Sequence, residues 1–331
     1  MPAHTHPVRL LAGILAAGVL AAASAGAAAQ ASYPSQPITF VVPYAAGGSS
    51  DTRARQLAQK LSASLGVSVI VDNKPGASGN IGTGQIANAK PDGYTIGLGN
   101  FAPMAVNAAL YTLNFDPVKD LAPIALIERG PLALGVSRQS PYADADALVR
   151  DAKANPDKLN YASTGAGSAS HLGTELLKSL AGFHATHVPY RGGAPAVNDL
   201  IAGNVDFYVE LPSLFLPHAS GAAPRIKMLA LASDNRVPGL PDVPTFKELG
   251  LPGMVMSNWF GVVAPAGVPQ EIIQTLNEHI NQALQAPDYR KIVESQGGEV
   301  AGGSPQDFKA FIASESERWR QLIAQQNISV Q

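Results

Sequence analysis

A strand–loop–helix–strand pattern occurs twice in this sequence, and the repeat constrains the fold more than any other feature. In the first copy, the apolar run 38–42 precedes a loop at 43–49 and a helix that ends at Gly66. The spacing of the apolar residues predicts one apolar face on this helix, with Arg53 on the opposite, polar face. A second apolar run at 67–71 then supplies the next strand.

The second copy follows about 120 residues later. The run 159–162 precedes a glycine-containing loop at 163–169, a helix that ends at Gly182 and a strand at 187–190. Further helix and strand segments extend each copy to a βαβαβ unit. Two such units predict an α/β protein with two lobes, each built on a mainly parallel sheet flanked by helices.

The lobes need two connections. Residues 129–131 suit the crossing into the second lobe, and the apolar runs 226–232 and 259–264 could carry the chain back. We therefore predict a signal peptide at 1–31, a first lobe from 32–129 and about 228–300, a second lobe from 130–227, and a C-terminal helix within 301–331 that packs across the lobes.

The signal peptide is predicted from an uncharged segment. Residues 10–31 carry no charged side chain, a single Arg9 precedes them, and the small residues 27–31 suit a signal peptidase. The alternative is an uncleaved membrane anchor, since the segment is long enough to span a bilayer. We favour export to the periplasm, and the absence of cysteine among 331 residues fits a protein that folds there without disulfides.

Composition excludes several classes of function. The chain is 46% hydrophobic, which is enough for a packed core and argues against global disorder. Its 23 basic and 25 acidic residues give a net charge of −2, which argues against broad nucleic-acid binding. The lack of cysteine removes thiolate chemistry.

The two loops after the first strand of each unit are the candidate binding elements. In open sheets, ligands bind beyond the carboxyl ends of parallel strands, and both loops lead there into helix N-termini. Loop one (43–51) and loop two (163–171) are rich in glycine, alanine and serine, so a ligand can approach their backbone closely. A site with backbone donors from both lobes suits a small anion, particularly a carboxylate. The alternative is that both loops are ordinary glycine-rich turns.

No catalytic or cofactor motif stands out. Ser168 and His171 are close in sequence, but no G-x-S-x-G motif frames a nucleophile. Asp51, Asp206 and Glu210 could form an acid–base set, although carboxylates near loops commonly cap helices. The segment 82–87 fits G-x-G-x-x-A but follows its strand too late for a dinucleotide site. We predict no enzyme activity, no cofactor and no metal.

Ordered matches along the whole chain after the export segment resemble one family, the solute-binding receptors of tripartite tricarboxylate transporters, often called Bug-type receptors. The matching segments include Val42-Pro43-Tyr44 with Ala46-Gly47-Gly48, Asn73-Lys74-Pro75-Gly76-Ala77, Pro91-Asp92-Gly93-Tyr94, His187-Val188-Pro189-Tyr190-Arg191-Gly192 and Trp259-Phe260-Gly261. The resemblance implies a type II-like Venus-flytrap fold, a periplasmic binding protein that closes on a small carboxylated solute. It also implies partners, either the membrane subunits of a tripartite transporter or a sensor protein. We expect a monomer that does not bind nucleic acid.

The resemblance also assigns ligand-binding roles to particular residues. Those in the first lobe are Tyr44, Ala46, Gly47, Gly48, Ser49 and Asp51, and those in the second are Thr164, Gly165, Ala166, Ser168 and His171. Asp206 would face the distal end of the ligand. Glu210 departs from the family pattern: it either points into the cleft and affects selectivity, or points outward as the solvated end of a strand. Other functions left open are a sensory receptor and a hydrolase of carboxylate esters that uses Ser168 and His171.

Overall fold

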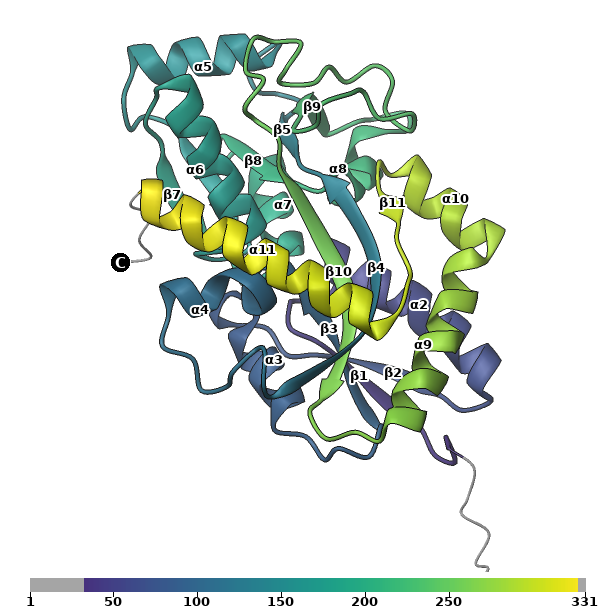
Figure 1. Cartoon of the computed structure of the whole chain (residues 1–331). Coiled ribbons are helices and arrows are strands. Elements are labelled where there is room, and N and C mark those ends of the chain that lie inside the picture. The colour runs from purple at the N-terminus through teal and green to yellow at the C-terminus, as the bar shows by residue number, and fades with distance from the viewer. Residues whose placement is uncertain (1–32, 327–331) are drawn as a thin grey trace, which may run out of the picture. The chain divides into compact units, whose positions relative to one another are not determined.

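Two mixed β-sheets carry the fold of the computed structural model, which describes residues 33–326 (Figure 1). Residues 33–35 belong to a separate N-terminal unit, and both sheets lie in the unit that begins at Gln36. The predicted signal peptide lies outside the described residues. The first sheet has the strand order β11-β4-β10-β3-β1-β2, with β1 (Ile38–Val42), β2 (Val69–Asn73), β3 (Thr95–Asn100), β4 (Leu121–Pro131), β10 (Ser257–Pro265) and β11 (Glu299–Val300).

The second sheet repeats this plan. Its order is β7-β6-β8-β5-β9, with β5 (Ala133–Ser137), β6 (Asn160–Ser163), β7 (Thr186–Pro189), β8 (Phe207–Glu210) and β9 (Ile226–Leu231). The three strands of each βαβαβ unit are parallel and equivalent, β2-β1-β3 in one sheet and β7-β6-β8 in the other. In each sheet an antiparallel strand comes next, β10 or β5. The two-lobed α/β prediction is confirmed, but the sheets are mixed because the strands that connect the lobes run antiparallel.

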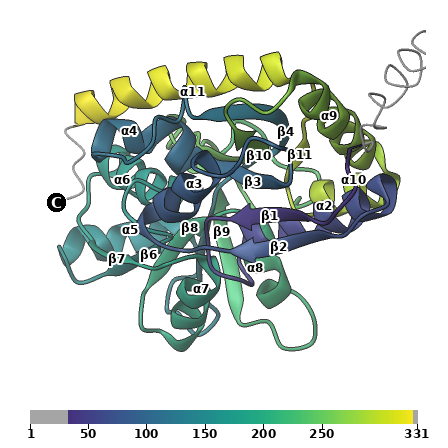
Figure 2. The same cartoon turned by 90° about the horizontal axis from the view of Figure 1, so that it is seen from below.

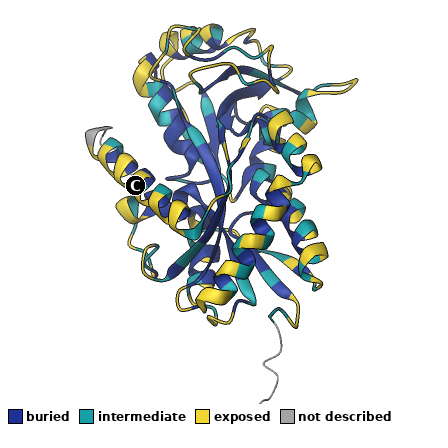
Figure 3. Ribbon diagram, turned by 45° about the vertical axis from the view of Figure 1, so that its right-hand side comes forward, coloured by how far each residue is buried: buried dark blue, intermediate teal, exposed yellow. Residues whose placement is uncertain are grey.

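Helices cover both sheets, and Figure 3 shows buried strands beneath helices that are exposed on one side. The α-helices are α2 (Ser49–Leu65), α3 (Asn80–Ala87), α4 (Asn107–Leu110), α5 (Ala145–Ala154), α6 (Ala169–Ala181), α7 (Gly193–Ala202), α8 (Pro212–Ala219), α9 (Gln270–Gln285), α10 (Pro287–Ser295) and α11 (Pro305–Gln326), with single turns η2 (Ala77–Gly79) and η3 (Ala102–Val106). Helices α2 and α6 end where predicted, at Gly66 and Gly182, both in the left-handed conformation. Between residues 33 and 326, none of these helices combines the length and apolar character needed to cross a bilayer.

The chain returns to the first sheet later than the predicted boundary near 228. Strand β9 pairs with β5 in the second sheet, and the backbone N–H of Met256 then donates to the Ala232 carbonyl at 3.0 Å. The return therefore occurs at Ser257, where β10 begins. The apolar run 226–232 misled the prediction because an apolar strand can fill an edge of either sheet.

Helix α11, yellow in Figures 1 and 2, packs its aromatic side chains onto the first lobe. Trp319 is 1% exposed and meets the Phe101 ring edge-on, with 5.0 Å between ring centroids. Phe308 meets Trp259 in the same way at 5.8 Å. Near the end of the helix, Leu322 lines a hollow together with residues of α6, which belongs to the second lobe.

Candidate functional site

The loops after β1 and β6 meet at a cavity of about 250 Å³ between the two lobes. Both loops follow the carboxyl ends of parallel strands, which is where an open sheet places its ligands. The cavity is lined by uncharged side chains and backbone except for one arginine: Tyr44, Gly76, Ala77, Ser78, Gly79 and Tyr111 from the first lobe, and Thr164, Gly165, Ala166, Pro189, Tyr190 and Arg191 from the second.

Asp51 holds loop one in place. Its Oδ2 accepts from the Gly47 backbone N–H at 2.9 Å and from Arg55 Nε at 3.0 Å, while Oδ1 accepts from Asn73 Nδ2 at 3.0 Å. Burial alone would raise the pKa of Asp51, but the hydrogen bonds from Arg55, Gly47 and Asn73 outweigh it and lower the pKa. Both carboxylate oxygens of Asp51 therefore have partners within loop one and its neighbours, so the residue holds the shape of this loop.

Two helix starts face each other across the lobes beside this loop. Helix α2 begins after Gly48 and α7 begins after Gly192, and no side chain caps the first turn of either helix. A Cβ atom added to Gly48 would lie 3.4 Å from the backbone N of Gly193. The first turns of both helices therefore lie close together where the lobes meet, and their N–H groups carry partial positive charge there.

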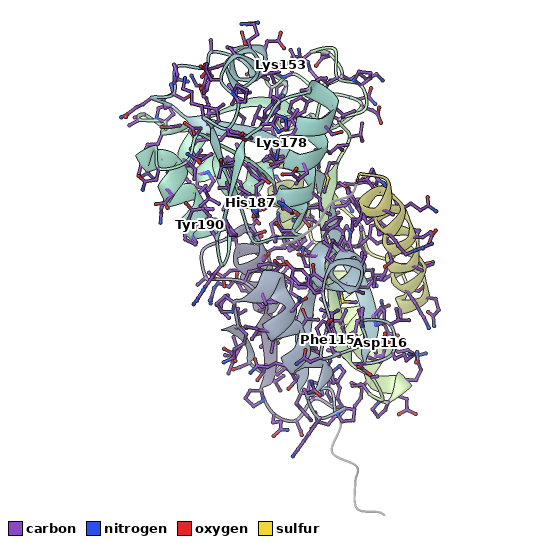
Figure 4. The ribbon with its side chains drawn as sticks, turned by 90° about the vertical axis from the view of Figure 1, so that its left-hand side faces the viewer. Phe115, Asp116, Lys153, Lys178, His187 and Tyr190 are labelled. Atoms are coloured by element: carbon purple, nitrogen blue, oxygen red, sulfur yellow. The ribbon has the colours of Figure 1, made fainter. Side chains whose placement is uncertain are left out.

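Two histidines form hydrogen bonds that hold loop two and the end of β6 in place. The Gly167 N–H donates to Nδ1 of His171 at 3.1 Å, and Nε2 of His187 lies 2.6 Å from Oγ of Ser163. The two imidazole rings stack with 4.3 Å between centroids, and Figure 4 labels His187 in the second lobe. Burial lowers the pKa of His171, and burial together with His171 lowers the pKa of His187 to about 4. His171 is therefore neutral at physiological pH, as its acceptor role requires.

Of the predicted second-lobe residues, Thr164, Gly165 and Ala166 line the cavity, whereas Ser168 and His171 lie behind the loop. Ser168 caps α6 by accepting from the His171 backbone N–H at 3.3 Å. In the first lobe, Tyr44 lines the cavity. The remaining predicted residues of loop one, Ala46, Gly47, Gly48 and Ser49, lead from Tyr44 into α2 beside the start of α7.

Glu210 is a buried residue at the carboxyl end of β8. It is 2% exposed, Oε1 accepts from the Leu211 N–H at 2.9 Å, and the Tyr208 hydroxyl donates to Oε2 at 3.3 Å. Asn258 and Ser170 also donate to it, and burial raises its pKa above the ordinary value despite these bonds. The outward, solvated alternative is therefore wrong.

Asp206 does not face the cleft. Its Oδ2 accepts from the Asn160 N–H at 2.7 Å, at the amino end of β6. Because β6 and β8 are parallel, with Tyr161 opposite Phe207, Asp206 lies at the far edge of the sheet from loop two. The prediction that it meets the ligand is corrected by the direction of β8, whose carboxyl end carries Glu210 instead.

Sequence reasoning missed the segment 76–79, Tyr111, Pro189 and Tyr190 as cavity residues. Gly76 and Ala77 lie within the matched segment 73–77, and Pro189 and Tyr190 lie within 187–192, so a signal was present without a structural role attached to it. Tyr111 follows the short helix α4, and no pattern in the sequence indicates that its hydroxyl reaches across to the other lobe.

The model of one protein family, the tripartite tricarboxylate transporter family receptor, matches residues 53–328. The chain belongs to this family. Protein BugT of Bordetella pertussis is 38% identical over 306 residues, covering 91% of this chain and 93% of BugT. The family is one of solute-binding receptors, and the predicted resemblance to it is confirmed.

Solved structures of family members have the same fold. The R. palustris protein Rpa4515, solved with adipate, is 35% identical with a TM-score of 0.87 over 90% of this chain and 99% of Rpa4515. MatC from Rhodopseudomonas palustris, solved with bound malate, is 32% identical with a TM-score of 0.82 over 88% of this chain and 100% of MatC. The two-lobed fold of a periplasmic binding protein is thus shared with this chain.

Proposed function

We propose that this receptor captures a small carboxylate between its lobes in the periplasm and delivers it to the membrane subunits of a tripartite transporter. The observation that carries the proposal is the pairing of two glycine-rich loops, each at a helix start, across a small cavity whose wall, among the described residues, carries no acidic side chain and one arginine. Adipate and malate, the ligands named for two relatives, are therefore suitable first probes.

The electrostatics of the site favour an anion. The starts of α2 and α7 carry partial positive charge, and Arg191 is the single charged side chain on the cavity wall. The charge of Asp51 is balanced by Arg55. Burial favours the neutral form of Glu210, which would reduce its repulsion of a bound carboxylate.

We propose binding without turnover. Ser168 caps α6 and the ring of His171 accepts from a loop amide, so the predicted serine–histidine pair is engaged in holding the loop. Ser163 and His187 form the closer serine–histidine contact, but Ser163 is fully buried behind loop two. Hydrolysis of carboxylate esters by the purified protein would contradict this part of the proposal.

The test is a thermal-shift titration of the purified protein without the signal peptide, using adipate, malate and the corresponding diamides. A ligand at one hundred times its Kd adds about 2.7 kcal/mol to the free energy of unfolding, which shifts Tm by several degrees. We expect at least one dicarboxylate to stabilise the protein and its diamide to have no effect.

Substitution of Gly48 separates charge from shape. The residue has extended backbone angles that any residue can adopt, so both Gly48→Asp and Gly48→Asn can serve as N-cap residues of α2. We expect both variants to fold, but Gly48→Asp to lose at least tenfold more affinity than Gly48→Asn, because its carboxylate competes for the same N–H groups. Equal affinities in the two variants would place the anion elsewhere.

A further inference from the structure

Within residues 33–326, three hydrogen bonds connect the lobes directly at the cavity, and each donor is in the first lobe. Oγ of Ser78 donates to the Ala166 carbonyl at 2.5 Å, and the Tyr111 hydroxyl donates to the same carbonyl at 2.8 Å. The Ala45 N–H donates to the Arg191 carbonyl at 3.3 Å. All of these are protein groups, so the bonds can form whether or not a solute is bound.

The backbone around Ser78 is held in an uncommon conformation that directs the serine toward the second lobe. Residues 76–79 all have positive φ, including Ala77 at 47° and Ser78 at 53°. Side-chain-bearing residues adopt this region at a cost and persist there when the surroundings impose it. The surroundings here include Asn107, whose Nδ2 donates to the Ser78 carbonyl at 3.3 Å.

The second lobe is shaped to accept this contact. A Cβ atom added to Gly165 would lie only 2.5 Å from Oγ of Ser78, and the φ of Gly165 is +122°. Glycine at this position therefore allows loop two to approach closely enough for the Ala166 carbonyl to reach both hydroxyls. A carbonyl oxygen has two lone pairs, so Ser78 and Tyr111 together satisfy it fully.

We propose that Ser78 and Tyr111 form a latch on the Ala166 carbonyl that stabilises the closed arrangement of the lobes without a solute. By biasing the equilibrium between open and closed forms, these positioning residues raise the apparent affinity for whatever solute binds the closed form. The latch concerns closure in the solute-free protein, so its test does not depend on the identity of the ligand proposed above.

The test is a distance measurement across the cleft by double electron–electron resonance. Because the chain has no cysteine, Gln85→Cys in α3 and Thr186→Cys in β7 provide two unique labelling sites on exposed residues, one in each lobe. The protein is unfolded, dialysed and refolded before labelling to remove any co-purified solute. Distances are compared among the labelled parent, Ser78→Ala with Tyr111→Phe, and a control, Tyr142→Phe. The Tyr142 hydroxyl bonds to Asp151 within the second lobe, at 2.6 Å.

We expect the parent and the control to show mainly the short distance of the closed form, and the latch variant to gain a longer one. Each lost hydrogen bond shifts the closed-to-open ratio by about fivefold, so the double variant should shift it about 25-fold. Thermal unfolding verifies that the variants remain folded, and the single variants give intermediate ratios. Indistinguishable distance distributions in the parent and the folded latch variant would overturn the proposal, as would a parent that is already fully open.

Discussion

Substituting Asp51 with alanine tests whether this residue braces loop one or contacts the ligand. In the structure, its buried carboxylate accepts from the Gly47 N–H, from Asn73 and from Arg55. The two hydrogen bonds from Gly47 and Asn73 to this charged group contribute about 1.5 kcal/mol each, the lower end of their range, and the Arg55 pair adds little because Arg55 is half-exposed. Asp51 also lies in the first turn of α2, where a negative charge contributes about 0.5 kcal/mol. We therefore expect Asp51→Ala to lower the free energy of unfolding by about 3 kcal/mol.

Urea unfolding measures this loss, and a double-mutant cycle with Asn73→Ala isolates the contact between the two side chains. We expect a coupling energy of about 1 kcal/mol, because Asn73 Nδ2 lies 3.0 Å from Oδ1 of Asp51. The affinity for a carboxylate should fall as well, since loop one loses its support. If Asp51→Ala unfolds within 0.5 kcal/mol of the parent, the brace is refuted, because a residue that served only the ligand would leave stability nearly unchanged.

Two further predictions concern buried side chains. Because burial raises the pKa of Glu210 above 4.5, the folded state binds its proton more tightly than the unfolded state; the parent should therefore lose stability as the pH rises from 4.5 through this raised pKa. Glu210→Gln should lack that loss. In urea unfolding from pH 4.5 to 8, the free energy of unfolding of the variant relative to the parent should therefore increase with pH. A difference between the two proteins that does not change with pH would contradict this prediction. Trp319→Ala should cost about 3–5 kcal/mol in chemical denaturation because the ring is buried against Phe101. Lys309→Ala, at an exposed position of α11, should change stability by less than about 0.5 kcal/mol.

The features that the sequence revealed depend on local pattern. The two copies of the strand–loop–helix–strand pattern, the glycines that end α2 and α6 and the loops at the helix starts could be read from short stretches. Because ligands bind beyond the carboxyl ends of parallel strands, each loop could be placed at that edge of its own sheet, and Tyr44 and Thr164 could be assigned to one site, as the shared cavity bears out.

The features that the sequence did not reveal depend on partners distant in the chain. Arg53 was expected on the polar face of its helix, but it is 2% exposed and forms a buried ion pair with Glu128 of β4. No pattern near residue 53 indicates a carboxylate 75 positions away. The same holds for Tyr111, which lines the cavity and bonds to a carbonyl 55 residues away in the chain. It also holds for β8, where the sequence did not indicate which end of the strand lies near the cleft.

The pairing of β4 with β10 has a mechanical consequence. These strands are hydrogen-bonded from Leu121 opposite Pro265 to Pro131 opposite Ser257, and the ladder continues through the crossing, where the Leu132 N–H donates to the Met256 carbonyl at 3.0 Å. A two-stranded ribbon of this kind bends easily in the direction perpendicular to its plane. Its hydrogen bonds resist sliding of one strand along the other. A separation of the lobes that bends this ribbon, without sliding its strands, would keep the two loops facing each other in the same register.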